Sequence, residues 1–240
     1  HEAWMKAGEQ AGYVRTGDYN GYRQEGFAKM SMTVKNGRRW STANAYLRPA
    51  LSRKTLKVET HARVVRIIFE GRRAVGLVYR KGAQEFTVRA RREVILSGGS
   101  INSPQLLKLS GIGPAAELKE HGIPVLADRA GVGENLQDHL EFYFQVACKQ
   151  PITLYSAMSP LAKLGIGLRW LLRKDGLGAT NHFESCGFIR SRAGIEYPDI
   201  QFHFLPLAVT YDGKGLASGH GFQAHVGPMR SKSRGWVRLN

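Results

Sequence analysis

The chain has 240 residues, of which 42% are hydrophobic, and its mean hydropathy is −0.30. This composition suffices for one large domain or two modest ones, and it excludes a disordered chain. The two cysteines, Cys148 and Cys186, are far apart and in no metal-type spacing, so neither a disulfide scaffold nor a metal site is predicted. No apolar run reaches the roughly 18 residues that a membrane-spanning helix needs.

Basic residues outnumber acidic ones, with 35 Lys and Arg against 19 Asp and Glu and a formal net charge of +16. They are scattered over turns and over the polar positions of alternating segments, whereas a nucleic-acid-binding protein usually concentrates them on one element. No nucleic-acid partner is therefore predicted. A solvated face is the simpler interpretation of the charge, and attraction to an anionic membrane surface is the alternative.

The first part of the chain changes from helices and loops to strands. A helix is expected over 2–11, and a second one, capped by Ser41, is expected to end at Leu47 near Pro49. Strands are predicted from alternating or β-branched segments at 56–60, 64–69, 74–79, 86–88 and 94–96. The last of these is wholly apolar and is expected to be a buried strand that follows a β-meander.

A turn and two helices are expected next. Gly98 and Gly99 allow a tight turn and a close approach of the backbone to a ligand. Ser103 is expected to cap the following helix, with Pro104 in its first turn. The elements after this helix are a short helix at 115–121 and a strand at 123–126. Together they indicate part of an α/β layer.

Beyond residue 140 the pattern is that of an antiparallel sheet with an amphipathic helix. The helix is expected over 161–173, and the strands are expected at 141–147, 184–189, 199–205, 222–226 and 235–239. The predicted fold class is α+β (mixed α/β), with one domain over 1–140 and a second over 141–240.

Two glycine motifs need to be distinguished from a dinucleotide fingerprint. The segment 111–116 formally fits that fingerprint, but a helix rather than a strand precedes it and Pro114 lies inside it. The Gly131-Val132-Gly133 segment has the same weakness. We interpret both as turns.

Two longer motifs resemble the signatures of one family: GSINSPQLLKLSGIG over 99–113 and GVGENLQDH over 131–139. Together they make the chain similar to the glucose–methanol–choline (GMC) oxidoreductases along essentially its whole length. The resemblance implies part of an FAD-binding α/β domain and part of an antiparallel substrate-binding domain. It also implies an internal piece, because the family's N-terminal dinucleotide-binding unit and its catalytic-histidine segment are not among these residues.

The resemblance assigns roles to individual residues. Val64 matches the position at which relatives bind the adenine through backbone groups, and Gly98 and Gly99 match a turn against the adenosine half of FAD. His203 matches an active-site histidine that helps to bind the alcohol and to stabilise charge at its oxygen. A core histidine without a catalytic role is the alternative for His203.

Choline is the alcohol that the resemblance favours, because segments 181–184 and 221–231 are most similar to family members that oxidise it. Glu184 matches the residue that binds its headgroup. A carboxylate in an otherwise apolar segment needs a positive partner, and a quaternary ammonium would supply one. A structural ion pair between Glu184 and an arginine is the alternative.

The resemblance therefore implies FAD-dependent oxidation of a primary alcohol, choline to betaine aldehyde, by hydride transfer to the flavin. Electrons would pass to a membrane quinone or a similar acceptor, with the protein peripheral on the cytoplasmic side of a bacterial membrane. The alternatives are another aliphatic or glycol alcohol, or a flavin-free basic binding module. The 240-residue chain alone is expected to be inactive and to bind FAD weakly or not at all.

Overall fold

The computed structural model describes residues 1–210 and 215–240, and the chain divides into two compact units. The first unit consists of His1–Ser52 and His139–Ser231, and the second consists of Arg53–Asp138 and Lys232–Asn240. The division expected from the sequence, 1–140 and 141–240, follows the order of the chain. The units instead join segments that are distant in sequence.

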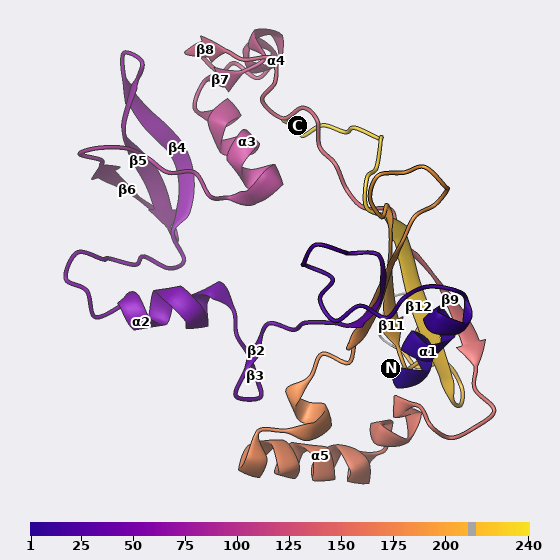
Figure 1. The fold of residues 1–240 in the computed structure, drawn as a ribbon. Coiled ribbons are helices and arrows are strands. Elements are labelled where there is room, and N and C mark those ends of the chain that lie inside the picture. Colours follow the sequence, from indigo (N-terminus) through magenta and orange to yellow (C-terminus); the bar gives the residue numbers. More distant parts are fainter. Residues whose placement is uncertain (211–214) are drawn as a thin grey trace. The chain divides into compact units, whose positions relative to one another are not determined.

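The first unit is built on an antiparallel sheet of five strands, in the order β1-β10-β11-β12-β9 (Figure 1). These strands are β1 (Gly26–Lys29), β9 (Phe142–Ala147), β10 (Ser185–Ile189), β11 (Ile200–Leu205) and β12 (Gly221–Pro228). The strands predicted over 141–147, 184–189, 199–205 and 222–226 are confirmed to within two residues at each end. Strand β1 was not predicted, because its four residues show no alternation.

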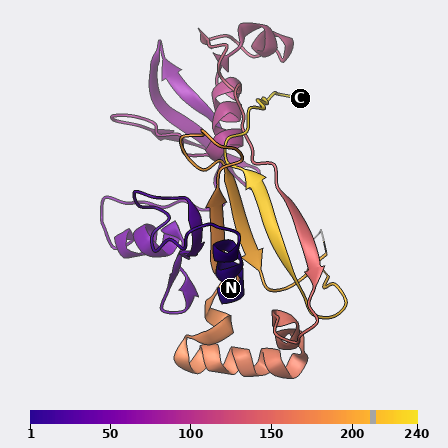
Figure 2. The same cartoon turned by 45° about the vertical axis from the view of Figure 1, so that its right-hand side comes forward.

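The sheet has one aromatic face and one polar face, as expected where successive side chains point to opposite sides. Helix α1 (Glu2–Gln10) lies against the aromatic face (Figure 2). There Trp4 stacks on Phe204 with ring centroids 5.0 Å apart and also contacts Phe27 and Phe202. The opposite face carries a small buried cluster near β1 and the polar residues of the candidate site.

Helix α5 (Pro160–Arg173) confirms the amphipathic helix predicted over 161–173. Ser159 caps it, since its hydroxyl accepts a hydrogen bond from the backbone N–H of Ala162, and it ends at Lys174 in the left-handed conformation. Trp170 attaches the helix to a hairpin by donating a hydrogen bond of 2.6 Å to the Gly37 carbonyl. The neighbouring short elements are β2 (Val34–Lys35), β3 (Arg38–Arg39), η2 (Leu154–Met158) and η3 (Gly176–Ala179).

The second unit contains the predicted meander, which is confirmed as β4 (Arg63–Glu70), β5 (Arg73–Lys81) and β6 (Gln84–Arg89) (Figure 1). Helix α3 (Gly99–Leu109) follows it, and α4 (Ala115–Glu120) confirms the short helix. A small parallel pair is formed by β7 (Ile112–Gly113) and β8 (Ala127–Asp128). The segment that links the units at residue 52 follows η1 (Ala43–Leu47) and α2 (Arg48–Ala50), so the helical stretch passes through Pro49.

Several sequence predictions for the second unit are wrong. Helix α3 begins at Gly99, so Ser103 and Pro104 lie inside it; the Ser103 hydroxyl instead accepts a hydrogen bond from the Gly98 N–H at 3.0 Å. Segments 56–60 and 94–96 form no strand, and Ile95 is 75% exposed. Segment 123–126 forms no strand, because pairing begins at Ala127, and 235–239 contributes one bridge to Leu136. These segments have strand-like composition, but none of the described strands lies beside them to complete a ladder.

A buried ion pair holds the C-terminal segment of this unit. Lys108 is fully buried, and its amine lies 2.7 and 2.8 Å from the carboxylate oxygens of Glu117 and 2.6 Å from the Val237 carbonyl. Burial raises the pKa of Glu117, but the Lys108 hydrogen bond, the Leu239 N–H and nearby cations outweigh it and leave this pKa below its usual value. A Cβ on Gly133 would lie 2.4 Å from the Val237 carbonyl, so the motif needs glycine there.

Candidate functional site

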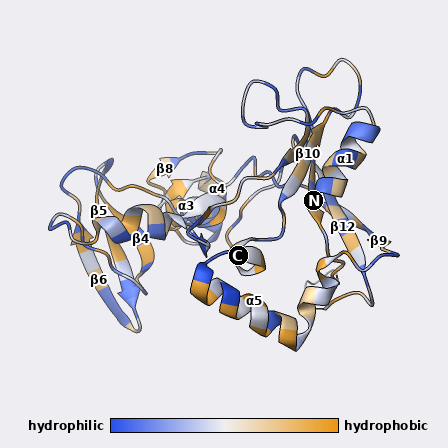
Figure 3. Ribbon diagram, turned by 60° about the horizontal axis from the view of Figure 1, so that its bottom comes forward, coloured by the Kyte–Doolittle hydropathy of each residue, from blue (hydrophilic) through white to orange (hydrophobic). Residues whose placement is uncertain are grey.

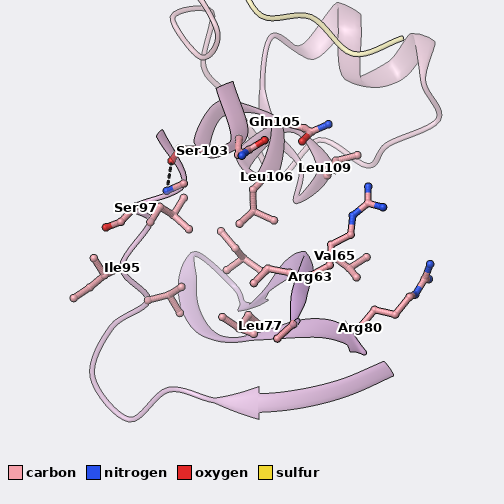
Figure 4. Close-up of a pocket in the computed structure, with 17 residues that line it drawn as sticks. Arg63, Val65, Leu77, Arg80, Ile95, Ser97, Ser103, Gln105, Leu106 and Leu109 are labelled. Carbon is pink, nitrogen blue, oxygen red and sulfur yellow. Dashed lines mark hydrogen bonds between the residues drawn. The ribbon is translucent and has the colours of Figure 1, made fainter. Parts of the chain in front are cut away.

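A cavity of about 680 Å³ lies in the second unit, between the β4–β5 sheet, helix α3 and the segment that precedes it (Figure 4). Apolar side chains from all three elements line it, and polar groups from Arg63, Arg80, Ser97 and Gln105 lie around them. Its volume is within the usual range for a small-molecule or cofactor site.

The structure places all three predicted cofactor residues of the chain at this cavity or beside it. Val64 lines the cavity at an irregularity of β4. Val64 pairs with Tyr79 and Arg66 pairs with Val78, so Val65 between them is an extra residue of the strand without a pairing partner. Gly98 also lines it, and a Cβ there would lie 3.2 Å from the Asn102 side chain. Gly99 has φ +86°, a conformation that favours glycine.

The second candidate site is the polar face of the five-stranded sheet in the first unit. The pairing register aligns Cys186, His203, His225 and Tyr143 on four adjacent strands. Directly paired residues point to the same face, so these side chains form one row across the sheet. Phe183 lies over the two histidines, with ring centroids 6.5 Å from His203 and 5.5 Å from His225.

His203 lines a small cavity of about 100 Å³ together with His139, Glu141, Gln201 and Met229. Burial lowers the pKa of His203, the charge of Glu141 raises it, and His225 lowers it, with a net shift below its ordinary value. The imidazole is therefore neutral at pH 7. A neutral imidazole in a cavity can exchange hydrogen bonds with a hydroxyl group of a ligand.

Glu141 is the carboxylate that shares this cavity with His203, and the sequence reasoning did not single it out. Its Oε1 lies 2.6 Å from the Nδ1 of His225. The His225 Nε2 in turn lies 2.5 Å from the side-chain nitrogen of Gln223, which is fully buried. Only the register of β9, β11 and β12 brings these residues together, and no spacing in the sequence signals it.

Glu184 lies outside both cavities, in the loop just before β10. Its Oε1 accepts a hydrogen bond of 2.6 Å from the Thr180 hydroxyl. No ion pair involves its carboxylate in the part of the chain that the structure describes, so the arginine partner considered from the sequence is absent from residues 1–210 and 215–240. His182 nearby has φ +66°, which turns the loop sharply before Phe183.

Three other properties of the described residues bear on function. They contain no group of three or more His, Cys, Asp or Glu side chains placed to hold a metal ion. None of their helices combines the length and the apolar character that crossing a bilayer requires. Burial raises the pKa of the Cys186 thiol to about 11, so this member of the row is an inert packing residue at neutral pH.

A family model described as GMC oxidoreductase matches residues 1–141 of the chain. The match covers more than half of the sequence and includes both motifs and the cavity of the second unit. The chain therefore belongs to the GMC oxidoreductase family.

The chain is also similar to individual curated relatives and to a solved structure. The chain is 63% identical over 238 residues to the oxygen-dependent choline dehydrogenase of Brucella ovis, covering 99% of this chain and 43% of the relative. It is 56% identical over 239 residues to the mitochondrial choline dehydrogenase of Homo sapiens, covering 100% of this chain and 40% of that protein. The crystal structure of pyridoxine 4-oxidase from Mesorbium loti matches with a TM-score of 0.81 and 27% identity, over 99% of this chain and 43% of that one. The chain thus spans less than half the length of the relatives it matches.

Proposed function

We propose that the protein to which this chain belongs oxidises choline to betaine aldehyde with FAD as its cofactor. One observation carries the proposal: a neutral histidine, His203, and a half-exposed carboxylate, Glu141, line one cavity on the polar face of the sheet. His203 can hydrogen-bond to a hydroxyl group, and the negative charge of Glu141 can attract a quaternary ammonium. The names of the relatives at 56–63% identity support choline as the alcohol.

The cavity of the second unit fits the nucleotide part of FAD. The bulge at Val65 breaks the regular ladder beside Val64, which suits recognition of a flat ring by backbone groups. A side chain at Gly98 would be tightly packed against Asn102, and Gly99 adopts a left-handed turn, so glycine at both positions lets the backbone approach a ligand closely. FAD, when bound, would supply the acceptor for the hydride that leaves the alcohol carbon.

The residues of this chain would bind and orient the alcohol. The neutral His203 would hydrogen-bond the alcohol oxygen and stabilise charge that develops on it. The faces of Phe183 and Tyr143, which pack on the histidines, would lie near a methylated ammonium group. We assign the proton-accepting base to no residue of this chain.

Glu141, rather than Glu184, is the carboxylate we propose for the ammonium group. Glu141 lines the cavity of His203, whereas Glu184 does not. Choline cannot donate a hydrogen bond through its headgroup, so a negative charge close to the hydroxyl-binding histidine is the feature that would select it. Glu184, as predicted from the resemblance, remains the alternative carboxylate.

The test compares Glu141→Gln with its matched control, Glu184→Gln, in the full-length protein. The measurement is kcat/KM for choline and for 3,3-dimethylbutan-1-ol, its uncharged isostere. Glu141→Gln should lower the preference for choline roughly 10- to 100-fold, less than for a fully buried pair because Glu141 is half exposed. Glu184→Gln should leave the preference unchanged. If only Glu184→Gln lowers the preference for choline, the cation site is at Glu184 instead. If neither variant changes the ratio of the two kcat/KM values, the proposal that the protein selects choline through a carboxylate is contradicted.

We further propose a peripheral contact with an anionic membrane surface, through α5. Five leucines of this helix are more than half exposed, among them Leu161 at 83% and Leu172 at 80%. Segments 34–40 and 159–175 contain seven Lys and Arg residues and one acid, Asp175, which pairs with Arg169. Figure 3 shows hydrophilic and hydrophobic residues alternating along α5. An amphipathic, basic helix of this kind suits the boundary of an anionic leaflet.

The electron acceptor and the side of the membrane are proposals of the same kind. A membrane quinone on the cytoplasmic side fits a peripheral protein, whereas the printed names of the bacterial relatives specify oxygen dependence. Rates with a soluble quinone analogue under argon, compared with rates in air, separate the two acceptors.

A further inference from the structure

We infer that the tip of the β2–β3 hairpin and the C-terminal end of α5 form a binding site for the phosphate group of an anionic phospholipid. The inference deepens the proposed membrane contact and depends on it for the source of the phosphate. That contact rests on the exposed leucines of α5, whereas the phosphate site rests on a separate group of cations at the end of the helix.

The hairpin places two cations directly opposite each other. Asn36 and Gly37 form its turn, with φ +51° and +66°, and the register pairs Lys35 with Arg38. Like charges at directly paired positions destabilise a pair of strands. Neither cation forms an ion pair within residues 1–210 and 215–240, although the Lys35 amine lies 5.2 Å from the centroid of the Trp40 ring. A bound anion would relieve this repulsion.

The end of α5 adds a third cation to the pair. Trp170 donates its hydrogen bond to the Gly37 carbonyl, and a Cβ on Gly37 would overlap the Lys174 carbonyl, so the hairpin tip and the helix end are in close contact. The Lys174 amine lies 3.9 Å from the centroid of the Trp170 ring, and the Arg38 guanidinium lies 5.9 Å from it. An aromatic ring attracts a cation without cancelling its charge. The contact region is therefore strongly positive.

A cavity of about 480 Å³ adjoins these cations, between the hairpin and the segment from η3 to Asn181. Arg39 lines it, and its guanidinium has no partner among the described residues. Asn181 also lines it, and its side-chain oxygen accepts a hydrogen bond of 3.1 Å from the Phe183 N–H, which leaves its NH₂ group as a donor. No acidic side chain of the described chain lines the cavity. Such a donor set suits an oxyanion and disfavours a cation.

The neighbouring surface indicates which oxyanion is bound. Leu171 and Leu172 follow Trp170 in the last turn of α5 and are 60% and 80% exposed. A phospholipid combines a phosphate group with apolar chains, and tryptophan rings favour the headgroup depth of a bilayer. Phosphatidylglycerol is the probe of choice, because its headgroup adds no positive charge.

The decisive variant is Lys35→Gln with Arg38→Gln in the full-length protein, which removes the opposed cations and keeps the leucines of α5. Affinity for vesicles of equal parts phosphatidylcholine and phosphatidylglycerol, measured by cosedimentation, should fall roughly 10- to 30-fold. Binding to phosphatidylcholine alone should not change. A hairpin variant that binds the mixed vesicles like the wild type would overturn the site.

The matched control is Lys54→Gln with Arg72→Gln, which removes the same charge from two exposed residues without an ion pair among the described residues. Its affinity for the mixed vesicles should fall less than about twofold, because its charges lie outside the contact. Equal losses in the two double variants would make the attraction a diffuse effect of net charge, and this would also overturn the site.

A second measurement tests the site without vesicles. Dihexanoylphosphatidylglycerol, kept below its micelle concentration, should change the tryptophan fluorescence of the wild type saturably, because the phosphate draws cations away from the Trp40 and Trp170 rings. The hairpin variant should not respond at the same concentrations. No saturable response of the wild type would overturn the inference, and an equal response to inorganic phosphate would overturn the assignment to a lipid. Wild-type protein that responds to the soluble lipid but binds no vesicle would support the site and defeat the proposed membrane contact instead.

Discussion

His203 experiences three influences of different kinds, and their balance decides which hydrogen bonds it can make. Burial disfavours its charged form, Glu141 favours it, and the electrostatic interaction with His225 disfavours it. The net effect is a pKa below the ordinary value, so the ring is neutral at pH 7. It can then exchange a hydrogen bond with an alcohol without forming an ion pair with Glu141.

Replacing His203 tests this role. In the full-length protein, His203→Ala should lower kcat/KM for the alcohol roughly 10- to 1000-fold, because a group that supports charge at the alcohol oxygen is lost. Flavin content, measured by absorbance, should stay unchanged, since His203 is not among the residues that line the cofactor cavity. An unchanged kcat/KM would make His203 a core residue only.

The pH dependence of the free energy of unfolding tests the lowered pKa of His203 independently of catalysis. The folded pKa of His203 is depressed, so its neutral form stabilises the fold above the unfolded pKa of about 6.5, and this contribution is lost as the pH falls through the folded pKa. His203→Gln removes the titration. Denaturant midpoints compared between pH 7 and pH 5 should therefore fall less in the variant than in the wild type.

At the residue scale the sequence could propose His203, Val64, Gly98 and Gly99 as site residues, because the resemblance to the family assigns roles to these positions. It could not supply the partners of His203. Glu141 begins an alternating segment and His225 lies in another, and each looks like an ordinary surface or core position. Their proximity results from the antiparallel register of three strands, which is a tertiary property.

At the scale of elements, strands with strong alternation were predictable and isolated apolar segments were not. The meander of β4, β5 and β6 has turns at Gly71–Arg72 and Gly82–Ala83, which specify local pairing. Segment 94–96 has the composition of a buried strand, but no described strand pairs with it. Composition indicates what a segment can form, and pairing requires a neighbour that the pattern does not identify.

Helix α5 provides a prediction at this scale. Leu164→Gln, Leu168→Gln and Leu172→Gln together should lower the affinity of the full-length protein for vesicles of phosphatidylcholine and phosphatidylglycerol at least roughly tenfold, since exposed leucines would no longer enter the interface. Cosedimentation measures the affinity. Raising the salt to about 0.5 M should weaken wild-type binding as well, because exposed charges are screened.

The matched control for α5 is Val58→Gln with Val88→Gln, two exposed apolar residues outside the helix, and it should leave vesicle binding unchanged. Wild-type protein that does not cosediment would contradict the membrane contact. So would a triple variant that binds like the wild type. A change in oligomeric state of the triple variant, without a change in vesicle binding, would assign the leucine face to contact between copies of the protein.

At the scale of the whole molecule, the chain distributes its chemistry between two units. The second unit has the cavity proposed for the nucleotide, and the first has the sheet whose polar face is proposed to receive the alcohol. The formal charge of +16 on this chain would not attract a cation at long range, so the proposed selection of choline would depend on local groups such as Glu141. Neither unit alone contains everything that the proposed reaction requires.

The central claim is best tested by adding choline to the full-length protein under anaerobic conditions and following the flavin absorbance. The protein should be yellow as purified, and choline should bleach it much faster than the same concentration of 3,3-dimethylbutan-1-ol. The 240-residue chain, treated in the same way, should bind little FAD and oxidise no choline. A colourless full-length protein, or a yellow one whose absorbance choline does not change, would contradict the account.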